Sequence, residues 1–166
     1  MLNLELKNWR IENKDNGVVW LYIDRENSKV NTFNVPLLKE LESVVGALEK
    51  DKDVKGVVIT SAKQSGFVLG ADIEQFTKVT KFDDAYEFVK RAHGIFDRLE
   101  ALKVPTLALI NGTCLGGGTE LSLACTYRIM VDDPKAKMGL PEILLGIFPG
   151  WGGSVRLPRL IGAVKA

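Results

Sequence analysis

Apolar residues recur along this chain at two spacings, every second residue in some segments and every third or fourth in others. Alternation at Leu2, Leu4 and Leu6 and a continuous run over residues 18–23 predict two strands, because both patterns suit a sheet. A turn centred on residues 15–17, Asp-Asn-Gly, would join them as a hairpin. Short apolar runs predict further buried strands over residues 57–60, 106–110 and 127–131.

Helical spacing fills the segments between these strands. Residues 36–50 place leucines and valines on one side, and Pro36 suits the first helical turn. The same spacing continues for longer over residues 83–103 and more briefly over residues 119–125. Strands that alternate with helices predict an α/β fold with a largely parallel sheet and right-handed crossovers. Because no internal repeat or linker interrupts the pattern, residues 1–166 are expected to form one domain.

The composition narrows the classes of function. A chain of 166 residues, 46% of them hydrophobic, can bury one ordinary core. Its 22 basic and 21 acidic residues leave no net field that would attract nucleic acid or a membrane surface. No apolar run reaches membrane-spanning length, and the first residues do not resemble an export leader. Cys114 and Cys125 match no metal spacing, which predicts reduced thiols, a cytoplasmic location and no metal site.

Two loops carry the candidate chemistry. Gly116, Gly117 and Gly118 lie between the end of the 106–110 strand and the start of a helix, where free N–H groups and the helix dipole favour negative charge. A second loop, residues 66–72, follows the 57–60 strand, and its Asp72 can cap a helix. Each loop could therefore direct one N–H group at the same oxygen, as in an oxyanion hole.

Two carboxylates accompany these loops, Glu120 after the three glycines and Glu142 in Gly-Leu-Pro-Glu. Together with an oxyanion hole they would polarise a carbonyl and move a proton beside it. Each feature also has a plainer interpretation, because glycines form tight turns and both glutamates could be ordinary acids in a first helical turn. The glycines do not match the dinucleotide-binding fingerprint.

Several other residues are interpreted as structural. His93 lies in the long amphipathic helix, far in sequence from either glycine loop. Trp151 is expected to pack beside a glycine-rich turn, with a wall of a substrate site as the second interpretation. We expect Arg156, Arg159 and Lys165 to form a solvated face.

The order and the amino-acid sequences of these loops resemble those of the crotonase (enoyl-CoA hydratase/isomerase) superfamily. The matching segments are residues 67–73, 111–121 and 139–153, so the resemblance covers nearly the whole chain. Val30-Asn31 and residues 152–159 look most like the amino-terminal hydratase domain of the alpha-subunit family of the fatty-acid oxidation complex. The resemblance implies the ClpP/crotonase fold of repeated ββα units. It also implies that carboxyl-terminal helices, which complete the acyl pocket in this superfamily, lie beyond residue 166.

The resemblance implies roles for particular residues. It places the oxyanion-hole amides at Ala71 and Gly117, where they would hold the thioester oxygen of an acyl-CoA. Glu120 would activate the attacking water and Glu142 would move the proton at the α carbon, with the individual assignment left open because two close carboxylates titrate together. Contacts to the acyl-CoA are expected at Gly70, Ala71, Asp72, Ile73, Gly116 and Gly117, and the loop over residues 71–76 is the best candidate for the adenine and phosphates.

The implied function is an enoyl-CoA hydratase that makes 3-hydroxyacyl-CoA during fatty-acid β-oxidation, with isomerisation of the double bond as a side activity. The first alternative is a truncated fragment that acts as a binding or assembly module, and the second is a hydrolase or isomerase on the same fold. The resemblance further implies a homo-oligomer and, for a longer protein, a thiolase beta subunit as partner. Coenzyme A enters as substrate, and no cofactor is implied for these residues. NAD would belong to a dehydrogenase region that follows in the alpha-subunit family.

Overall fold

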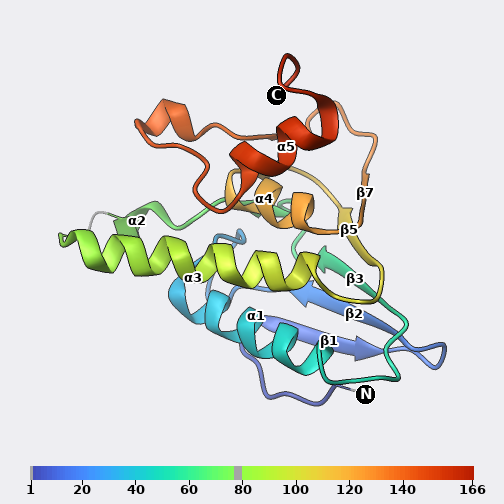
Figure 1. Cartoon of the computed structure of the whole chain (residues 1–166). Helices are drawn as coiled ribbons and strands as arrows, with labels where there is room; N and C mark the ends of the chain where they lie inside the picture. The colour runs from blue at the N-terminus through green and yellow to red at the C-terminus, as the bar shows by residue number, and fades with distance from the viewer. Residues whose placement is uncertain (1, 77–79) are drawn as a thin grey trace.

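The computed structural model describes the backbone of residues 2–76 and 80–166 (Figure 1). Its centre is a five-stranded sheet with the strand order β1-β2-β3-β5-β7. The strands are β1 (Trp9–Asn13), β2 (Val18–Ile23), β3 (Gly56–Ser61), β5 (Thr106–Ile110) and β7 (Tyr127–Met130). β1 pairs antiparallel with β2, and the other neighbouring strands are parallel. The predicted α/β organisation with a largely parallel sheet is therefore confirmed.

Helices cover one face of this sheet. α1 (Val35–Leu48) and α3 (Phe82–Glu100) lie side by side across it, and α4 (Gly117–Ala124) and α5 (Gly153–Ile161) stack beyond α3 (Figure 1). The helices predicted over residues 36–50 and 83–103 are confirmed, although both end two or three residues earlier than expected. α1 begins after Asn34, whose side-chain oxygen accepts a hydrogen bond of 2.9 Å from the N–H of Leu37.

The core lies between the sheet and these helices. Alternate residues of β2 point toward α1 and α3 and are fully buried, because successive side chains of a strand face opposite sides. They meet one apolar side of each helix. The central side chains are Leu21, Ile23, Ile59, Ile110, Leu37, Leu41, Phe96 and Leu99.

The opposite face of the sheet is less covered than the sequence predicted. The 106–110 and 127–131 runs were expected to be buried strands, and both do form strands. In β5, however, Leu107 and Leu109 are only half-buried, and in the edge strand β7 the side chains of Tyr127 and Ile129 are 61% and 56% exposed. The expectation of full burial was wrong because these four side chains share the face of the sheet opposite the helices described above.

The strand predicted from Leu2, Leu4 and Leu6 does not form. Residues 2–6 have no strand assignment, and the first strand begins at Trp9. The alternation instead records burial, since all three leucines pack on the core while the residues between them are exposed. The side chain of Asn13 holds Leu2 by hydrogen bonds to its N–H and carbonyl, 3.1 and 2.9 Å long.

The predicted hairpin turn is confirmed, but it joins β1 to β2. The N–H of Gly17 donates to the carbonyl of Lys14, and the N–H of Lys14 donates to the carbonyl of Val18, both at 2.9 Å. Gly17 has a φ of 82°, which side-chain-bearing residues rarely adopt. The Asp-Asn-Gly sequence therefore fixes the turn as expected.

A second sheet was not predicted. It has three parallel strands of two residues each, β4 (Val68–Leu69), β6 (Cys114–Leu115) and β8 (Met138–Gly139), in the order β4-β6-β8. Strands this short leave no periodic pattern of apolar residues in the sequence. The residues that follow each of these strands form the candidate site.

Candidate active site

The three short strands deliver three segments to one edge. Leu69, Leu115 and Gly139 share one row of the small sheet, so the residues just beyond them emerge side by side. These residues are Gly70 and Ala71 after β4, Gly116 and Gly117 after β6, and Glu142 after β8. Carboxyl ends of parallel strands are where α/β proteins commonly place ligands. The structure thus brings together the two glycine loops and the second glutamate predicted from the sequence.

Phe33 determines the direction in which the Ala71 amide points. The N–H of Phe33 donates to the carbonyl of Gly70, and the N–H of Asp72 donates to the carbonyl of Phe33, both at 2.8 Å. Ala71 is the residue directly opposite Phe33 in this parallel bridge. The middle residue of such a bridge turns its own N–H to the other side. The Ala71 N–H therefore points toward β6 and the glycine loop.

The glycine loop opens α4. Gly116 has a φ of 53°, and its N–H donates to the carbonyl of Gly139 at 2.9 Å. Gly117 is the first residue of the helix, so its N–H has no acceptor within the helix. A Cβ on Gly70 would lie 3.8 Å from the nitrogen of Gly117, which shows how closely the two loops approach. A Cβ on Gly117 would overlap the ring of Trp151, so only glycine fits there.

Glu120 projects from the first turn of α4 and is 2% exposed. Its Oε1 accepts two backbone hydrogen bonds, 2.8 Å from the N–H of Trp151 and 2.9 Å from the N–H of Gly153. Burial raises the pKa of this carboxyl above its ordinary value, while the two N–H groups oppose that rise. The nearby Glu142 raises the pKa further, and Arg156 lowers it.

Glu142 is the first residue of a short 3₁₀ helix, η1 (Glu142–Leu145), and is 8% exposed. Its Oε1 lies 3.2 Å from the position that a Cβ on Gly116 would occupy. Its Oε2 is buried and has no hydrogen-bond partner among the described residues. Burial raises the pKa of the Glu142 carboxyl above its ordinary value. Burial thus raises the pKa of both glutamates.

Thr119 fastens the segment that carries Glu142. Its hydroxyl oxygen lies 2.9 Å from the carbonyl oxygen of Cys114 and 2.8 Å from that of Gly139, so it bridges β6 and β8. The N–H of Gly146 then closes η1 on the carbonyl of Ile143 at 3.1 Å. These contacts fix both ends of the loop on which Glu142 lies.

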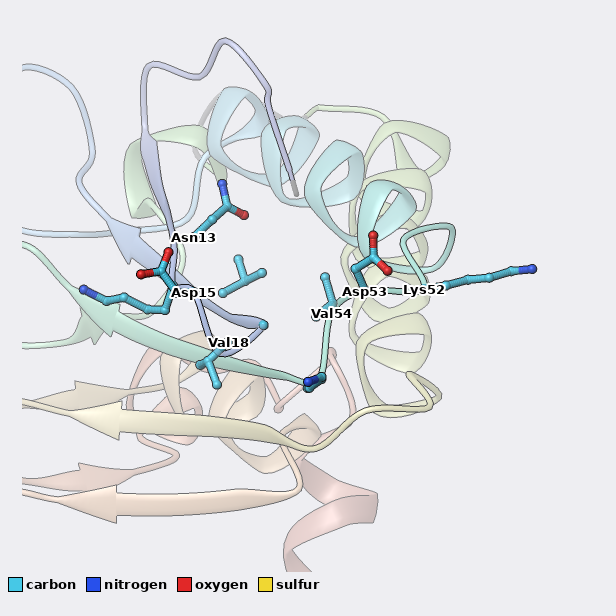
Figure 2. Close-up of a pocket in the computed structure, with 10 residues that line it drawn as sticks. Asn13, Asp15, Val18, Lys52, Asp53 and Val54 are labelled. Carbon is cyan, nitrogen blue, oxygen red and sulfur yellow. The ribbon is translucent and has the colours of Figure 1, made fainter.

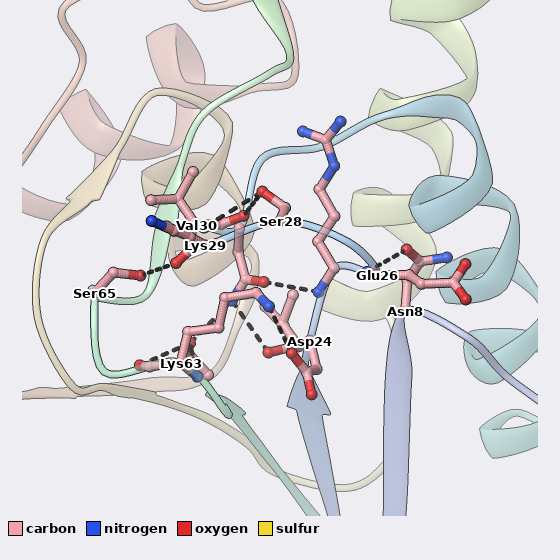
Figure 3. Close-up of polar contacts among 12 residues, drawn as sticks. Asn8, Asp24, Glu26, Ser28, Lys29, Val30, Lys63 and Ser65 are labelled. Atoms are coloured by element: carbon pink, nitrogen blue, oxygen red, sulfur yellow. Dashed lines mark hydrogen bonds and ion pairs between the residues drawn. The ribbon is translucent and has the colours of Figure 1, made fainter.

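A polar network holds the segments that lead into Phe33 and into the loop over residues 66–72 (Figure 3). Lys63 pairs with Asp24 at 2.7 Å, and the hydroxyl of Ser65 donates to the carbonyl of Lys29 at 2.7 Å. Both contacts join the segment after β2 to the segment after β3. The buried side-chain amide of Asn31 adds donations to the hydroxyl of Ser61 and, at 3.1 Å, to the carbonyl of Phe67. The segment that leads into Phe33 is thereby fixed.

Asp72 and Ile73, the other residues predicted to contact the acyl-CoA, directly follow Ala71. Asp72 caps α2 (Ile73–Phe76) through a 3.2 Å hydrogen bond from the N–H of Glu74, and it pairs with Arg25 at 2.7 Å. The side chain of Ile73 is 56% exposed. Part of the loop expected to meet the adenine and phosphates, the side chains of residues 75 and 76, lies outside the described residues.

The predicted exposure of Arg156, a residue beside the site, was wrong. Arg156 was expected on a solvated face, but it is 8% exposed and bonds to side chains of α3 and to the carbonyl of Trp151. Arg159 and Lys165 are exposed as expected. The packing role of Trp151 is confirmed by edge-to-face contacts with Phe33, Phe88 and Phe96.

Two pockets lie away from these residues. One, of about 390 Å³, lies between the β1–β2 turn and residues 52–55 and is lined by charged and apolar side chains (Figure 2). The other, of about 570 Å³, lies along α1 and α3. Within residues 2–76 and 80–166, no group of three or more His, Cys, Asp or Glu side chains could hold a metal ion. In the same ranges no helix combines the length and apolar character needed to cross a bilayer.

Known proteins are similar to this chain in sequence and in fold. The alpha subunit of the fatty acid oxidation complex of Shewanella loihica is 41% identical over 96% of this chain, and that of Aliivibrio fischeri is 43% identical over 92%. The chain spans only 23% and 22% of the length of these relatives. The crystal structure of an enoyl-CoA hydratase from Bacillus anthracis matches with a TM-score of 0.88 and 34% identity, over 96% of this chain and 60% of that one.

The predicted crotonase-like α/β fold is thus confirmed by solved structures that share it. The family described as enoyl-CoA hydratase/isomerase matches residues 13–166, which include both glycine loops and both glutamates. The resemblance drawn from the loop sequences is confirmed as well, since the relatives are named as alpha subunits of the fatty acid oxidation complex. The chain belongs to the enoyl-CoA hydratase/isomerase family.

Proposed function

We propose that this chain carries the hydratase site of an enzyme that adds water across the 2,3 double bond of an enoyl-CoA. The observation that supports this most directly is the meeting of two glycine loops and two buried glutamates at one sheet edge. The N–H groups of Ala71 and Gly117 would donate to the thioester oxygen, on which negative charge develops as water adds. Gly116, Asp72 and Ile73 would lie along the bound coenzyme A.

The two glutamates differ in a way that suits different roles. Burial raises the pKa of both carboxyls, but Glu120 accepts two N–H groups on Oε1, which oppose that rise and favour its carboxylate form. Glu142 has a buried, unpartnered Oε2, and its raised pKa favours the acid. Glu120 would take a proton from water as the oxygen bonds to the β carbon, and Glu142 would give its proton to the α carbon. Transfer of a proton from Glu120 back to Glu142 would restore both groups, so the sum is one water added, and the product is a 3-hydroxyacyl-CoA.

The first test follows the loss of conjugated thioester absorbance when the 166-residue protein meets crotonyl-CoA. Glu120→Gln and Glu142→Gln keep the size of each side chain and remove the carboxylate, so both should abolish the loss. Glu87→Gln, at an exposed position on α3, is the matched control and should leave the rate unchanged. Equal rates in all four proteins would contradict the proposal, and an inactive parent protein would favour the alternative of a fragment that binds or assembles without catalysis.

Isomerisation of the double bond is proposed as a side activity, since moving a proton at the α carbon is common to both reactions. Product mass separates them, because hydration adds one water and isomerisation adds nothing. A product of unchanged mass alone would favour an isomerase. The site would use coenzyme A only as part of the substrate.

Self-association is proposed from a patch of exposed apolar side chains. The stretch after Glu142 exposes Ile143 at 79%, Leu144 at 83% and Phe148 at 74%. Large apolar surfaces of this kind usually meet a partner. A second copy of the chain in a homo-oligomer would cover these side chains. A partner protein would cover them if the chain acts as a binding or assembly module without catalysis. Light scattering that showed a monomer without binding of a hydrophobic dye would contradict both.

The named relatives suggest a wider setting for the same site. We propose that these residues serve a fatty-acid oxidation alpha subunit in the cytoplasm, with a thiolase beta subunit as partner. NAD would be used only by a dehydrogenase region outside residues 1–166. Co-purification of a tagged full-length protein with a thiolase tests this assembly.

A further inference from the structure

Arg156 is a buried cation that ties α5 to α3. Its Nε donates to Glu100 at 2.8 Å, and its Nη2 donates to Asp97 at 2.6 Å. Both acids lie on α3, and their side chains are more than half exposed, whereas the side chain of Arg156 is 8% exposed. The ion pair therefore holds a buried arginine at a fixed place between two helices.

The third contact of Arg156 is with the turn that binds Glu120. Its Nη1 donates to the carbonyl of Trp151 at 3.0 Å, and its backbone N–H donates to the carbonyl of Gly152 at 2.8 Å. Gly152 has a φ of 103°, and a Cβ at that position would overlap the guanidinium. The arginine thus packs directly beneath the turn, where only glycine leaves room for it.

The same turn presents two N–H groups on its other side. The N–H groups of Trp151 and Gly153 both donate to Oε1 of Glu120. Arg156 donates to two carbonyls of the turn, and the turn donates two N–H groups to Glu120. A continuous chain of contacts therefore runs from α3 through Arg156 and the turn to the carboxyl group of Glu120. Other charged or titratable groups face this chain: Glu142 from η1, and Asp97, Glu100 and His93 from α3.

We propose that Arg156 is a positioning residue that holds the Trp151–Gly153 turn on Oε1 of Glu120 and thereby leaves the other oxygen for the reacting water. The importance of that oxygen rests on the proposed hydratase function, but the positioning itself does not. The proposal can therefore be tested without measuring turnover.

The experiment uses the full 166-residue chain with ¹³C-labelled glutamate and ¹⁵N-labelled backbone, read by NMR. Glu120→Gln identifies the Glu120 carboxyl signal, which is then titrated in the parent, Arg156→Met, Arg156→Lys and Arg159→Met. Exchange of the Trp151 and Gly153 amide hydrogens is measured alongside that of amides in β3. Arg159→Met is the matched control, because Arg159 lies on the same helix and is exposed.

Loss of the arginine should raise the pKa of Glu120 further, since both the cation and ordered donors are removed. The Trp151 and Gly153 amides should exchange about tenfold faster while β3 amides keep their protection. Arg156→Lys keeps the charge without the planar fork, so it should restore the titration only in part and leave the fast exchange.

Three results would overturn the proposal. They are an unchanged Glu120 titration and exchange in Arg156→Met, full restoration by Arg156→Lys, and equal effects from Arg159→Met. If Arg156→Met does not fold, Arg156→Lys decides, because slow exchange of both turn amides in that folded variant would show that charge alone suffices. Equal hydration rates in the parent, Glu120→Gln and Glu142→Gln would contradict the proposed function and leave this measurement valid.

Discussion

The carboxyl group of Glu142 rests against the backbone of Gly116, with Oε1 3.2 Å from where a Cβ on that glycine would be. The two residues follow different strands of the small sheet, so their contact depends on the register of β6 and β8. The absence of a side chain at residue 116 is therefore what allows the acid to reach the mouth of the glycine loop.

Gly116→Ala should damage both stability and activity. The φ of 53° is costly for alanine, and the new methyl group would press on Glu142 and on the backbone of Gly70. We expect a loss of about 1–3 kcal/mol in the free energy of unfolding. Displacement of the acid should lower the hydration rate about a hundredfold.

Urea unfolding and the crotonyl-CoA assay measure these two effects. Gly94→Ala is the control, because Gly94 lies inside α3 and nothing is within 4 Å of its added Cβ. It should raise stability by about 1 kcal/mol. Equal effects of the two substitutions would show that residue 116 has no special constraint.

Ala71→Pro tests the proposed oxyanion donor. Proline removes the N–H of residue 71, while the hydrogen bonds that Phe33 makes use Gly70 and Asp72 and can persist. The hydration rate should fall about a hundredfold to a thousandfold. Ala71→Gly keeps the N–H and should retain most of the rate. Equal rates for the two variants, with similar melting temperatures, would remove Ala71 from the mechanism.

Glu142 should make the protein less stable as the pH rises. Because burial raises its pKa in the folded state, the folded protein holds this proton more tightly than the unfolded chain. The stabilising effect is complete below the unfolded value of 4.5 and is lost as the pH passes through the folded value. Glu142→Gln should therefore be more stable than the parent at pH 7, and the difference should shrink toward pH 4. Denaturant unfolding at both pH values checks the sign, and a less stable variant at pH 7 would contradict it.

Both cysteines should be unreactive until the protein unfolds. Burial raises the pKa of Cys114 to about 11 and that of Cys125 to about 12, so almost no thiolate exists at neutral pH. A thiol-specific chromogenic reagent should therefore react only at the rate of unfolding, and two equivalents should react at once in denaturant. Rapid reaction of one thiol in the native protein would show that its site opens locally.

The sequence predicted the large elements because their apolar patterns are long enough to carry a period. It placed β2, β3, β5, α1 and α3 to within a few residues. The alternation at residues 2–6 led to a wrong prediction, because an extended segment that packs every second leucine on the core has the same pattern as a strand. The three two-residue strands could not be predicted, since nothing in so short a segment distinguishes it from a loop.

The candidate site was predicted in its loops and acids but not in its supports. Glycine runs and carboxylates carry a signal that can be read locally. Asn31, Phe33 and Arg156 act through contacts with residues far away in the chain. Arg156 looks in sequence like any surface arginine, and only the two acids on α3 that it meets explain its burial.

The small sheet also has a consequence for how such a site can change over time. Each of its strands leads into one component of the proposed site, and each component begins one to three residues after its strand ends. A substitution or insertion after β8 could exchange the acid at residue 142 while both amide loops keep their places. The architecture is therefore modular, and new reactions on acyl thioesters could arise by revising one strand end at a time.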